Sequence, residues 1–199
     1  MDVLSTLAFV TASVVLLVRH AEAEPPDPHL TDDDRPLTDA GRLAAARLTR
    51  RLTQRAVRAV YSSPARRALQ TVELIASDHS LPVHVMDDLR ERQLATQDLP
   101  EPAFIEALRQ AREDPALALP GGESTNDALA RALDALASIR RGSPLGVAVA
   151  ATHGGLISIV RWHLGQEFSV EDALAEPMPA IYPLRWERGQ WRVEAARYV

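Results

Sequence analysis

Two histidines that each follow an apolar run are the most chemically distinctive feature of this 199-residue chain. His20 comes directly after Arg19 at the end of one run, and His153 precedes Gly154 at the end of another. An arginine pair at 66–67 follows a third run. Guanidinium groups bind phosphate oxygens through paired hydrogen bonds, a neutral imidazole can attack phosphorus, and a protonated imidazole can stabilise the oxygens. These residue types therefore indicate chemistry on a phosphoryl group.

A metal site is the alternative use of His20 and His153. Metal sites need carboxylates or further histidines nearby, whereas the residues expected around these two are arginines, which repel a cation. The chain has no cysteine, which excludes disulfides, thiolate zinc sites and a cysteine nucleophile. We therefore expect a site that uses no metal and no organic cofactor.

Alternating strand-like and helix-like segments must position these residues. Short apolar runs predict buried strands at 14–18, 59–62, 83–86 and 146–151. Stretches with helical spacing predict helices at about 39–55, 64–77, 103–113, 125–140 and 155–164. This order predicts an α/β fold of three layers, in which helices flank a mostly parallel central sheet. Segments 180–187 and 190–197 predict a C-terminal antiparallel hairpin at the edge of that sheet.

The carboxyl ends of parallel strands meet at one edge of a sheet, and ligands bind beyond that edge. The sequence therefore predicts that His20, His153 and the arginine pair at 66–67 converge there. Ser63 is a predicted N-cap and Pro64 a predicted first helical residue, which places both arginines in the first turn of a helix. The exposed amide groups of such a turn favour an anion.

Composition limits the classes of protein to which the chain can belong. With 46% hydrophobic residues, 22 basic and 27 acidic residues and a net charge of −5, it is expected to form one globular domain over 1–199. Within it we expect an N-terminal extension at 1–12 and a small insertion or lid at about 87–123. Basic and acidic residues alternate along the chain, which argues against binding to nucleic acid or to a membrane. The oligomeric state stays open.

The apolar segment 3–18 could be taken for a secretory signal. A signal needs positive charge before its apolar run, but the only early charge is Asp2, and the first basic residue is Arg19. The segment is also too short for a comfortable membrane span. We therefore predict a cytoplasmic protein.

Six short segments, spread over most of the chain, match motifs that occur together in one family. They are LLVRHAEAE at 16–24, RPLTDAGR at 35–42, YSSPARRALQT at 61–71, DDLRER at 87–92, PGGES at 120–124 and ATHGG at 151–155. In this order they resemble the histidine phosphatase superfamily, the phosphoglycerate-mutase-like proteins. The resemblance implies that His20 accepts the phosphoryl group and that Arg19, Arg67 and His153 complete the phosphate pocket. Three further residues of these motifs are predicted to contact phosphate or substrate: Gly154, Glu22 and Thr38.

The resemblance also implies that Glu91 donates and accepts the proton of the reaction. The residues alone do not single it out, because several acidic side chains lie in the same loop region. Glu91 lies between Arg90 and Arg92, so a surface ion pair is an equally good interpretation of the local sequence.

Two departures from the family pattern bear on function. Ala21 stands where the commonest motif has glycine, which removes a residue that tolerates positive φ. Pro25 and Pro26 replace the Trp-Asn pair of the cofactor-dependent mutases, and only about thirty residues separate Glu91 from Gly121. A site enclosed by so small an insertion admits water, which favours hydrolysis over transfer back to a substrate.

We therefore expect a histidine acid phosphatase-like phosphomonoester hydrolase that acts on a small phosphorylated metabolite through a phosphohistidine intermediate. Three alternatives remain. The chain could be a protein-phosphohistidine phosphatase of the short bacterial type, or a phosphoglycerate mutase. It could also be a phospholigand-binding module with weak catalysis, if the turn at Ala21 misdirects the nucleophile.

Overall fold

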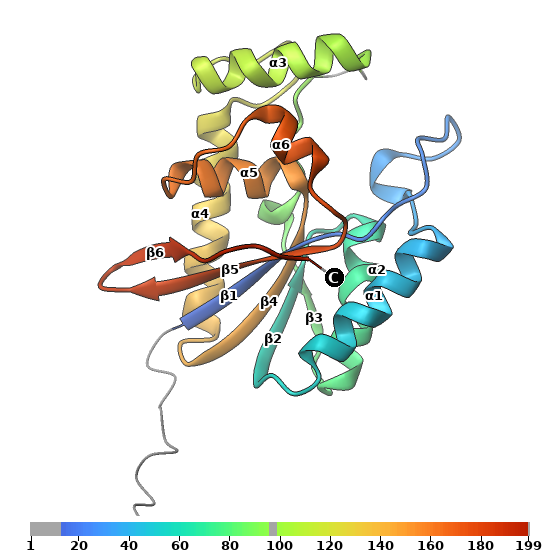
Figure 1. The fold of residues 1–199 in the computed structure, drawn as a ribbon, viewed down its shortest axis with the longest axis vertical. Coiled ribbons are helices and arrows are strands. Elements are labelled where there is room, and N and C mark those ends of the chain that lie inside the picture. The colour runs from blue at the N-terminus through green and yellow to red at the C-terminus, as the bar shows by residue number, and fades with distance from the viewer. Residues whose placement is uncertain (1–12, 96–98, 199) are drawn as a thin grey trace, which may run out of the picture.

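The computed structural model describes residues 13–95 and 99–198 (Figure 1). The predicted N-terminal extension at 1–12 lies outside the described residues. No helix in the described part of the chain is both long and apolar enough to cross a membrane.

A seven-stranded sheet forms the middle layer, in the order β3-β2-β4-β1-β5-β6, with β7 paired to β5. The parallel part consists of β1 (Ser13–Arg19), β2 (Val57–Ser62), β3 (Val83–Val85) and β4 (Gly146–Thr152). The antiparallel part consists of β5 (Ala180–Glu187), β6 (Gln190–Val193) and β7 (Arg197–Tyr198). The predicted mostly parallel sheet with a C-terminal hairpin at its edge is confirmed.

Helices cover both faces of the sheet, as predicted for a three-layer fold (Figure 1). One face carries α1 (Asp39–Leu52) and α2 (Arg66–Asp78), and the other carries α4 (Thr125–Gly142) and α5 (Gly154–His163). Two short 3₁₀ turns, η2 (Asp32–Asp34) and η3 (Asp87–Leu89), interrupt the loops. The remaining helices, α3 (Glu101–Glu113) and α6 (Val170–Ala175), lie beyond α5 and away from the sheet (Figure 1).

Strand β1 shows why its apolar run is continuous. Val15 and Leu17 pack into the core cluster that contains residues of α4 and α5. Leu16 and Val18 pack into the cluster on the other face, with residues of α1 and α2. Because successive side chains of a strand point to opposite faces, a strand buried on both faces needs apolar residues at every position.

Two local predictions differ from the structure. Helix α2 begins at Arg66, after Ala65 as N-cap, so the predicted cap at Ser63 and first helical residue at Pro64 are wrong. The Ser63 hydroxyl accepts from the Ala65 amide over 3.3 Å, ahead of the helix, and is also hydrogen-bonded to His153. Helix α6 was not predicted at all, because six residues are too few to show a helical period. Its N-terminus is defined by a capping box between Ser169 and its third residue.

Candidate active site

Three strand ends bring the chemically distinctive residues together at one edge of the sheet. The His20 amide donates to the Thr152 carbonyl over 3.1 Å, and the Ser63 amide donates to the Ala151 carbonyl over 2.9 Å. These bonds hold the segments after β1, β2 and β4 side by side. As a result the rings of His20 and His153 lie with their centroids 5.2 Å apart.

His20 is oriented by its own turn. Its Nδ1 lies 2.8 Å from the Ala21 carbonyl oxygen, which can only accept, so Nδ1 holds the proton and Nε2 carries the lone pair. The Ala21 amide is fixed by the Thr71 hydroxyl at 3.0 Å. Besides glycines, the only described residues with positive φ are Ser80 and Arg188, so Ala21 needs no glycine-like conformation. The alanine therefore does not disturb the backbone that orients the His20 ring and its Nε2 lone pair.

Arg67 connects the two imidazole rings. Its Nε lies 3.3 Å from His20 Nε2, and its Nη2 lies 3.4 Å from His153 Nδ1. Since a guanidinium only donates, both ring nitrogens act as acceptors. His153 Nε2 then holds the ring proton and donates to the Ser63 hydroxyl over 2.8 Å. One buried arginine thus fixes the tautomers of both histidines.

Burial and positive charge keep both rings neutral at neutral pH. Burial is the main cause that lowers the pKa of His20 to about 4, and Arg67 and Arg19 lower it further. Burial also holds the pKa of His153 well below its ordinary value, with contributions from His20 and Arg67. A neutral His20 is the nucleophilic form. The sequence suggested a protonated His153, but burial and the neighbouring positive charge disfavour that form in the free protein. The negative charge of a bound phosphoryl group would favour it.

The lowered pKa of His20 predicts a pH-dependent stability. Between pH 6.5 and about 4, His20 is protonated in the unfolded chain but neutral in the folded protein. Stability is therefore full above pH 6.5 and falls as the pH drops toward 4, by an amount on the order of 3 kcal/mol. Urea midpoints measured across this range should fall steeply in the parent protein and less in His20→Asn. The exposed His84 provides the control, since His84→Asn should keep the steep fall.

Arg19 offers a donor beside the imidazole pair. Its Nη1 donates to the Glu176 carbonyl over 2.8 Å, which fixes the guanidinium at the end of α6. Its Nε is buried, and no described group accepts a hydrogen bond from it. A Cβ on Gly154 would lie 3.0 Å from this Nε, so the glycine makes room for the guanidinium. An unpaired buried donor is costly, and an anion at this position would satisfy it.

Asp32 is a site residue that sequence reasoning missed. Its carboxylate lies 2.7 Å from Arg67 Nη2 and 2.7 Å from Arg35 Nη2, and its carbonyl accepts from Arg67 Nη1. Burial alone would raise the pKa of Asp32, but Arg67 and Arg35 lower it below its usual value. The ionised Asp32 therefore balances part of the positive charge at the site. It belongs to a run of three aspartates whose sequence gives no sign of this contact.

Glu91 caps α5 from the wall of the site. One carboxylate oxygen accepts from the Leu156 amide at 2.9 Å, and the other accepts from the Gly155 amide at 2.9 Å. The surface ion pair considered from the sequence is not formed with Arg90, which pairs with Asp33 and Asp87. Glu91 thus presents its carboxylate within the site from a fixed position.

Two predicted contact residues lie elsewhere. Thr38 caps α1 by accepting from the Gly41 amide at 2.9 Å, and its own amide donates to the Glu22 carbonyl over 3.1 Å. The described residues that line the cavity at the site do not include Thr38 or Glu22, nor do they include Arg67 or His153, which lie behind His20 and contact its ring. In this structure Thr38 and Glu22 support the turn after His20, and their contact with a ligand stays a prediction.

A cavity of about 380 Å³ opens at this edge of the sheet. Its wall contains His20, Arg19, Glu91 and Gly154. Arg35, Arg92 and Trp162 also line it. Within the described part of the chain, no cluster of three or more His, Asp or Glu side chains could hold a metal ion.

Known proteins share this sequence pattern and fold. The sequence profile of the histidine phosphatase superfamily (branch 1) matches residues 15–198. A comparison with curated protein sequences gives no significant match. The solved complex of mycobacterial glucosyl-3-phosphoglycerate phosphatase with inorganic phosphate is 25% identical, with a TM-score of 0.72, over 92% of this chain and 95% of that chain.

Two further solved structures share the fold. Bacillus stearothermophilus YhfR is 24% identical, with a TM-score of 0.71, over 92% of this chain and 95% of that chain. Phosphoglycerate mutase from Bacillus anthracis is 18% identical, with a TM-score of 0.70, over 94% of each chain. The fold is therefore common to phosphatases and mutases.

Proposed function

The chain belongs to the histidine phosphatase superfamily (branch 1), and from that membership we propose that it hydrolyses phosphomonoesters through a phosphohistidine intermediate. One observation supports this most strongly. The neutral His20 has its Nε2 lone pair 3.3 Å from the guanidinium of Arg67, in a cavity that also contains Arg19. A nucleophile and phosphate-binding cations are thus already in place. The similar mycobacterial phosphatase has been solved with inorganic phosphate, which fits this chemistry.

In the proposed first step, His20 Nε2 attacks phosphorus and the bond from phosphorus to the alcohol oxygen breaks. Arg19 and Arg67 neutralise the phosphoryl oxygens, whose negative charge in turn favours a protonated His153, and Glu91 in its protonated form gives its proton to the leaving alcohol. In the second step a water attacks the phosphohistidine, Glu91 takes the water's proton, and phosphate leaves. The enzyme returns to its starting state without a metal or an organic cofactor.

Two observations favour hydrolysis of a small substrate over the other functions considered. Ala21 leaves the nucleophile well directed, which weakens the hypothesis of a weakly catalytic binding module. The cavity is walled by side chains of α3, α5 and α6, such as Phe104, Trp162 and Leu174. Such walls suit a small phosphorylated molecule better than a histidine on the surface of a partner protein.

A trapped phosphoenzyme tests the proposal. The protein is mixed with phenyl phosphate labelled at phosphorus and denatured in alkaline detergent, because phosphohistidine is stable to base and labile to acid. We expect label on the parent protein and on His163→Ala, which alters an exposed histidine at the end of α5. His20→Asn should stay unlabelled. Release of phosphate without a base-stable adduct, or label that persists in His20→Asn, would refute the proposal.

Glu91→Gln tests the proton transfer. The substitution keeps the size of the side chain but removes the group that exchanges protons. For alkyl phosphates we expect kcat/KM to fall by about 10²-fold or more, and for p-nitrophenyl phosphate by less than about 10-fold, since nitrophenolate leaves without a proton. The measurement is kcat/KM over a series of leaving groups of different acidity.

Glu91 also caps α5, so stability must be measured beside activity. A lower melting temperature together with equal losses over the whole series would mean that Glu91 acts only as a cap.

A further inference from the structure

The cavity extends well beyond the phosphate-binding residues, and its outer wall is apolar. Helix α3 contributes Phe104 and Leu108, and α5 contributes Ile159 and Trp162. The segment around α6 contributes Phe168, Val170, Leu174 and Met178. We call the part of the cavity lined by these eight side chains the outer chamber. It is continuous with the wall that contains His20, so it is the space open to the alcohol part of a bound phosphomonoester.

Polar side chains around the outer chamber are already hydrogen-bonded within the protein. Thr125 donates its hydroxyl to the Ala111 carbonyl over 2.8 Å, and Ser158 donates to the Gly154 carbonyl over 2.8 Å. Arg112 donates to the Phe168 carbonyl. A substrate with several hydroxyl groups would find few free partners here, and each buried hydroxyl left unpaired would cost binding energy.

Arg92 and Arg35 are also engaged. Arg92 Nε donates to the Glu123 carbonyl over 3.3 Å. Arg35 pairs with Asp32 and donates to the Glu24 carbonyl over 2.8 Å. Among the described residues, Arg35 is therefore fully paired within the protein, whereas Arg92 is held only through its Nε and is the one cation of the two that keeps donors for a ligand.

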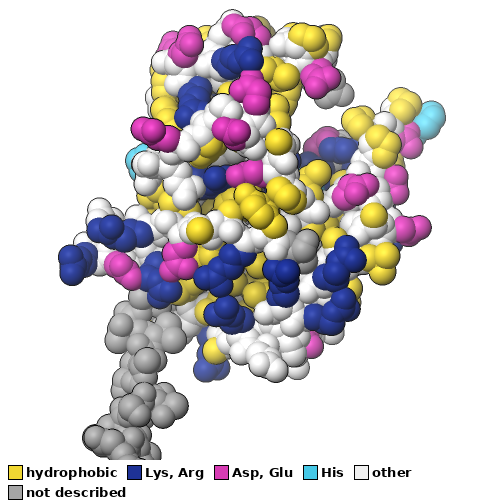
Figure 2. All heavy atoms as spheres, viewed as in Figure 1, with side chains coloured by type: hydrophobic (Ala, Val, Ile, Leu, Met, Phe, Trp, Pro, Cys, Tyr) yellow, Lys and Arg dark blue, Asp and Glu magenta, His cyan; other side chains and the backbone are white. Residues whose placement is uncertain are grey.

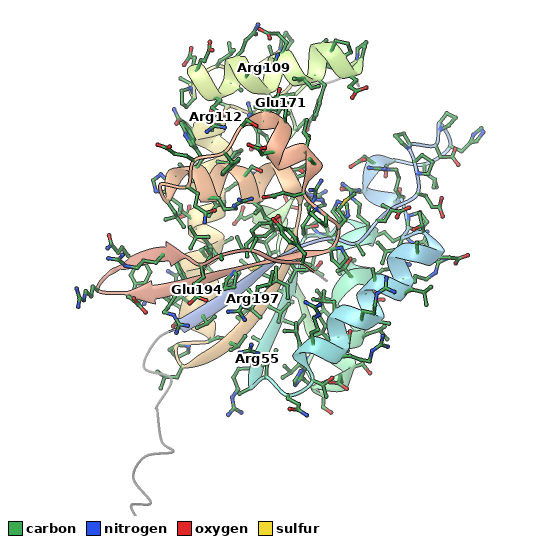
Figure 3. All side chains as sticks on the ribbon, in the orientation of Figure 1. Arg55, Arg109, Arg112, Glu171, Glu194 and Arg197 are labelled. Atoms are coloured by element: carbon green, nitrogen blue, oxygen red, sulfur yellow. The ribbon has the colours of Figure 1, made fainter. Side chains whose placement is uncertain are left out.

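The walls of the outer chamber are fixed in place by cations. The Arg112 guanidinium lies over Phe168 at 5.3 Å and over Trp162 at 5.9 Å from the ring centroids. Arg109 of α3 forms an ion pair with Glu171 of α6 at 2.5 Å. Figure 3 shows Arg109, Arg112 and Glu171 between the two helices. The chamber therefore exists before a substrate enters, which lowers the entropic cost of binding.

The segment that carries Phe168 and Met178 is also anchored to the body of the protein. Arg161 is buried, lies 4.5 Å from the Phe168 ring centroid and pairs with Glu176 at 2.7 Å. Tyr182 of β5 donates its hydroxyl to the same carboxylate. Phe168 is thus held against two guanidinium groups, so its ring offers a fixed apolar surface.

At the mouth of the outer chamber, apolar surface is left uncovered. Leu174 is 42% exposed and Met178 is 40% exposed, and both line the cavity. Figure 2 shows hydrophobic side chains gathered on this face below α3 and between α6 and β5. A ligand that covers this surface gains the free energy of apolar burial.

We propose that the physiological substrate is a phosphomonoester whose alcohol is bulky and largely apolar, of the size of one or two rings, and not a phosphorylated sugar or glycerate. This inference rests on the proposed phosphatase activity. The phosphoryl group is held by the cations around His20, and the outer chamber holds the apolar alcohol. A polyhydroxylated alcohol would be disfavoured because the chamber offers it few free hydrogen-bonding partners.

Three primary-alcohol phosphates of similar leaving-group acidity test the proposal: 2-phenylethyl phosphate, glycerol 3-phosphate and glucose 6-phosphate. We expect kcat/KM for 2-phenylethyl phosphate to exceed the other two by at least about 30-fold. Equal values, or a preference for either hydroxylated substrate, would overturn the inference and leave the proposed function intact. If p-nitrophenyl phosphate and all three substrates are left unhydrolysed, the proposed function itself fails.

A binding measurement tests the outer chamber without turnover. Calorimetry should show that 2-phenylethylphosphonate binds at least about 10-fold more tightly than methylphosphonate. Equal affinities would overturn the inference whatever the activity measurements show.

The Leu108→Asn variant tests whether the outer chamber causes the preference for 2-phenylethyl phosphate. The variant places an amide of similar size in the apolar wall, so the ratio of kcat/KM between 2-phenylethyl phosphate and glycerol 3-phosphate should fall by about 10-fold. Leu74→Asn is the matched control, because Leu74 is 48% exposed on α2 and lies outside the cavity lining. It should leave the ratio unchanged. A ratio that stays constant in Leu108→Asn, or one that falls equally in the control, would contradict the assignment.

Discussion

His20→Ala should lower kcat/KM for p-nitrophenyl phosphate by about 10⁴-fold or more, because it removes the nitrogen that forms the covalent intermediate in the proposed mechanism. His153 cannot replace it. The Nε2 of His153 donates to Ser63, its Nδ1 accepts from Arg67, and the residue is only 1% exposed. The loss should be equally large for every leaving group, since the missing nucleophile is needed whatever alcohol departs.

Folding of the His20→Ala protein can be checked separately from its activity. The ring makes one side-chain hydrogen bond to the backbone of the next residue, and burial already disfavours its charged form. We therefore expect a circular dichroism spectrum and a melting temperature at pH 7.5 close to those of the parent. His163→Ala, which removes an exposed imidazole, should keep full activity. A folded His20→Ala protein with a rate within about 10-fold of the parent would exclude His20 as the nucleophile.

The convergence of His20, Arg67 and His153 could be predicted because it depends on strand ends. Each of them follows an apolar run, and parallel strands buried on both faces produce such runs. Once the order of strands and helices indicates a parallel sheet, the carboxyl ends must share one edge. The sheet and its flanking helices followed from the same pattern.

Other features of the site depend on contacts that no local pattern records. Asp32 and Arg67 are 35 residues apart, and Ser63 and His153 are 90 residues apart. Local rules even misled at Ser63, where a serine before a proline resembles a helix cap. Its hydroxyl accepts from the Ala65 amide before the helix begins, and its shorter bond is to an imidazole from another strand end. Tertiary contacts of this kind override local preference and need the assembled fold.

The outer chamber was unpredictable for a related reason. Its wall combines side chains from α3, from α5 and from the short α6, and of these helices only α5 directly follows a strand of the sheet. The Trp162 ring lies beside Arg112 and lines the cavity, a contact that no local pattern records. The proposed specificity therefore depends on how these helices pack against one another.

Arg67→Met should lower kcat/KM for p-nitrophenyl phosphate by about 10²-fold to 10³-fold, because it removes a cation that the proposed mechanism places on the phosphoryl oxygens. Two further changes follow from the geometry. Both imidazole rings lose the donor that fixes their tautomers, and Asp32 keeps Arg35 but loses one of its two arginine partners. A carboxylate without that partner repels a phosphate dianion, so the inhibition constant of inorganic phosphate should rise by about 10-fold or more.

The adjacent arginine provides a matched control for this effect. Arg66 is exposed at the start of the same helix, so Arg66→Met changes the net charge equally but should leave kcat/KM within about twofold of the parent. Equal losses in the two variants would mean that only the overall charge near α2 matters. Such a result would remove Arg67 from the phosphate pocket.

A second substitution separates lost attraction from new repulsion. In the Arg67→Met background, Asp32→Asn removes the carboxylate that the arginine had balanced, so part of the affinity for phosphate should return. In the parent background the same change leaves Arg67 unbalanced, and phosphate should bind at least as tightly as before. If Asp32→Asn fails to recover any affinity in the Arg67→Met protein, Asp32 does not act on phosphate through its charge. The loss in Arg67→Met would then come from the missing guanidinium and the misoriented imidazole rings alone.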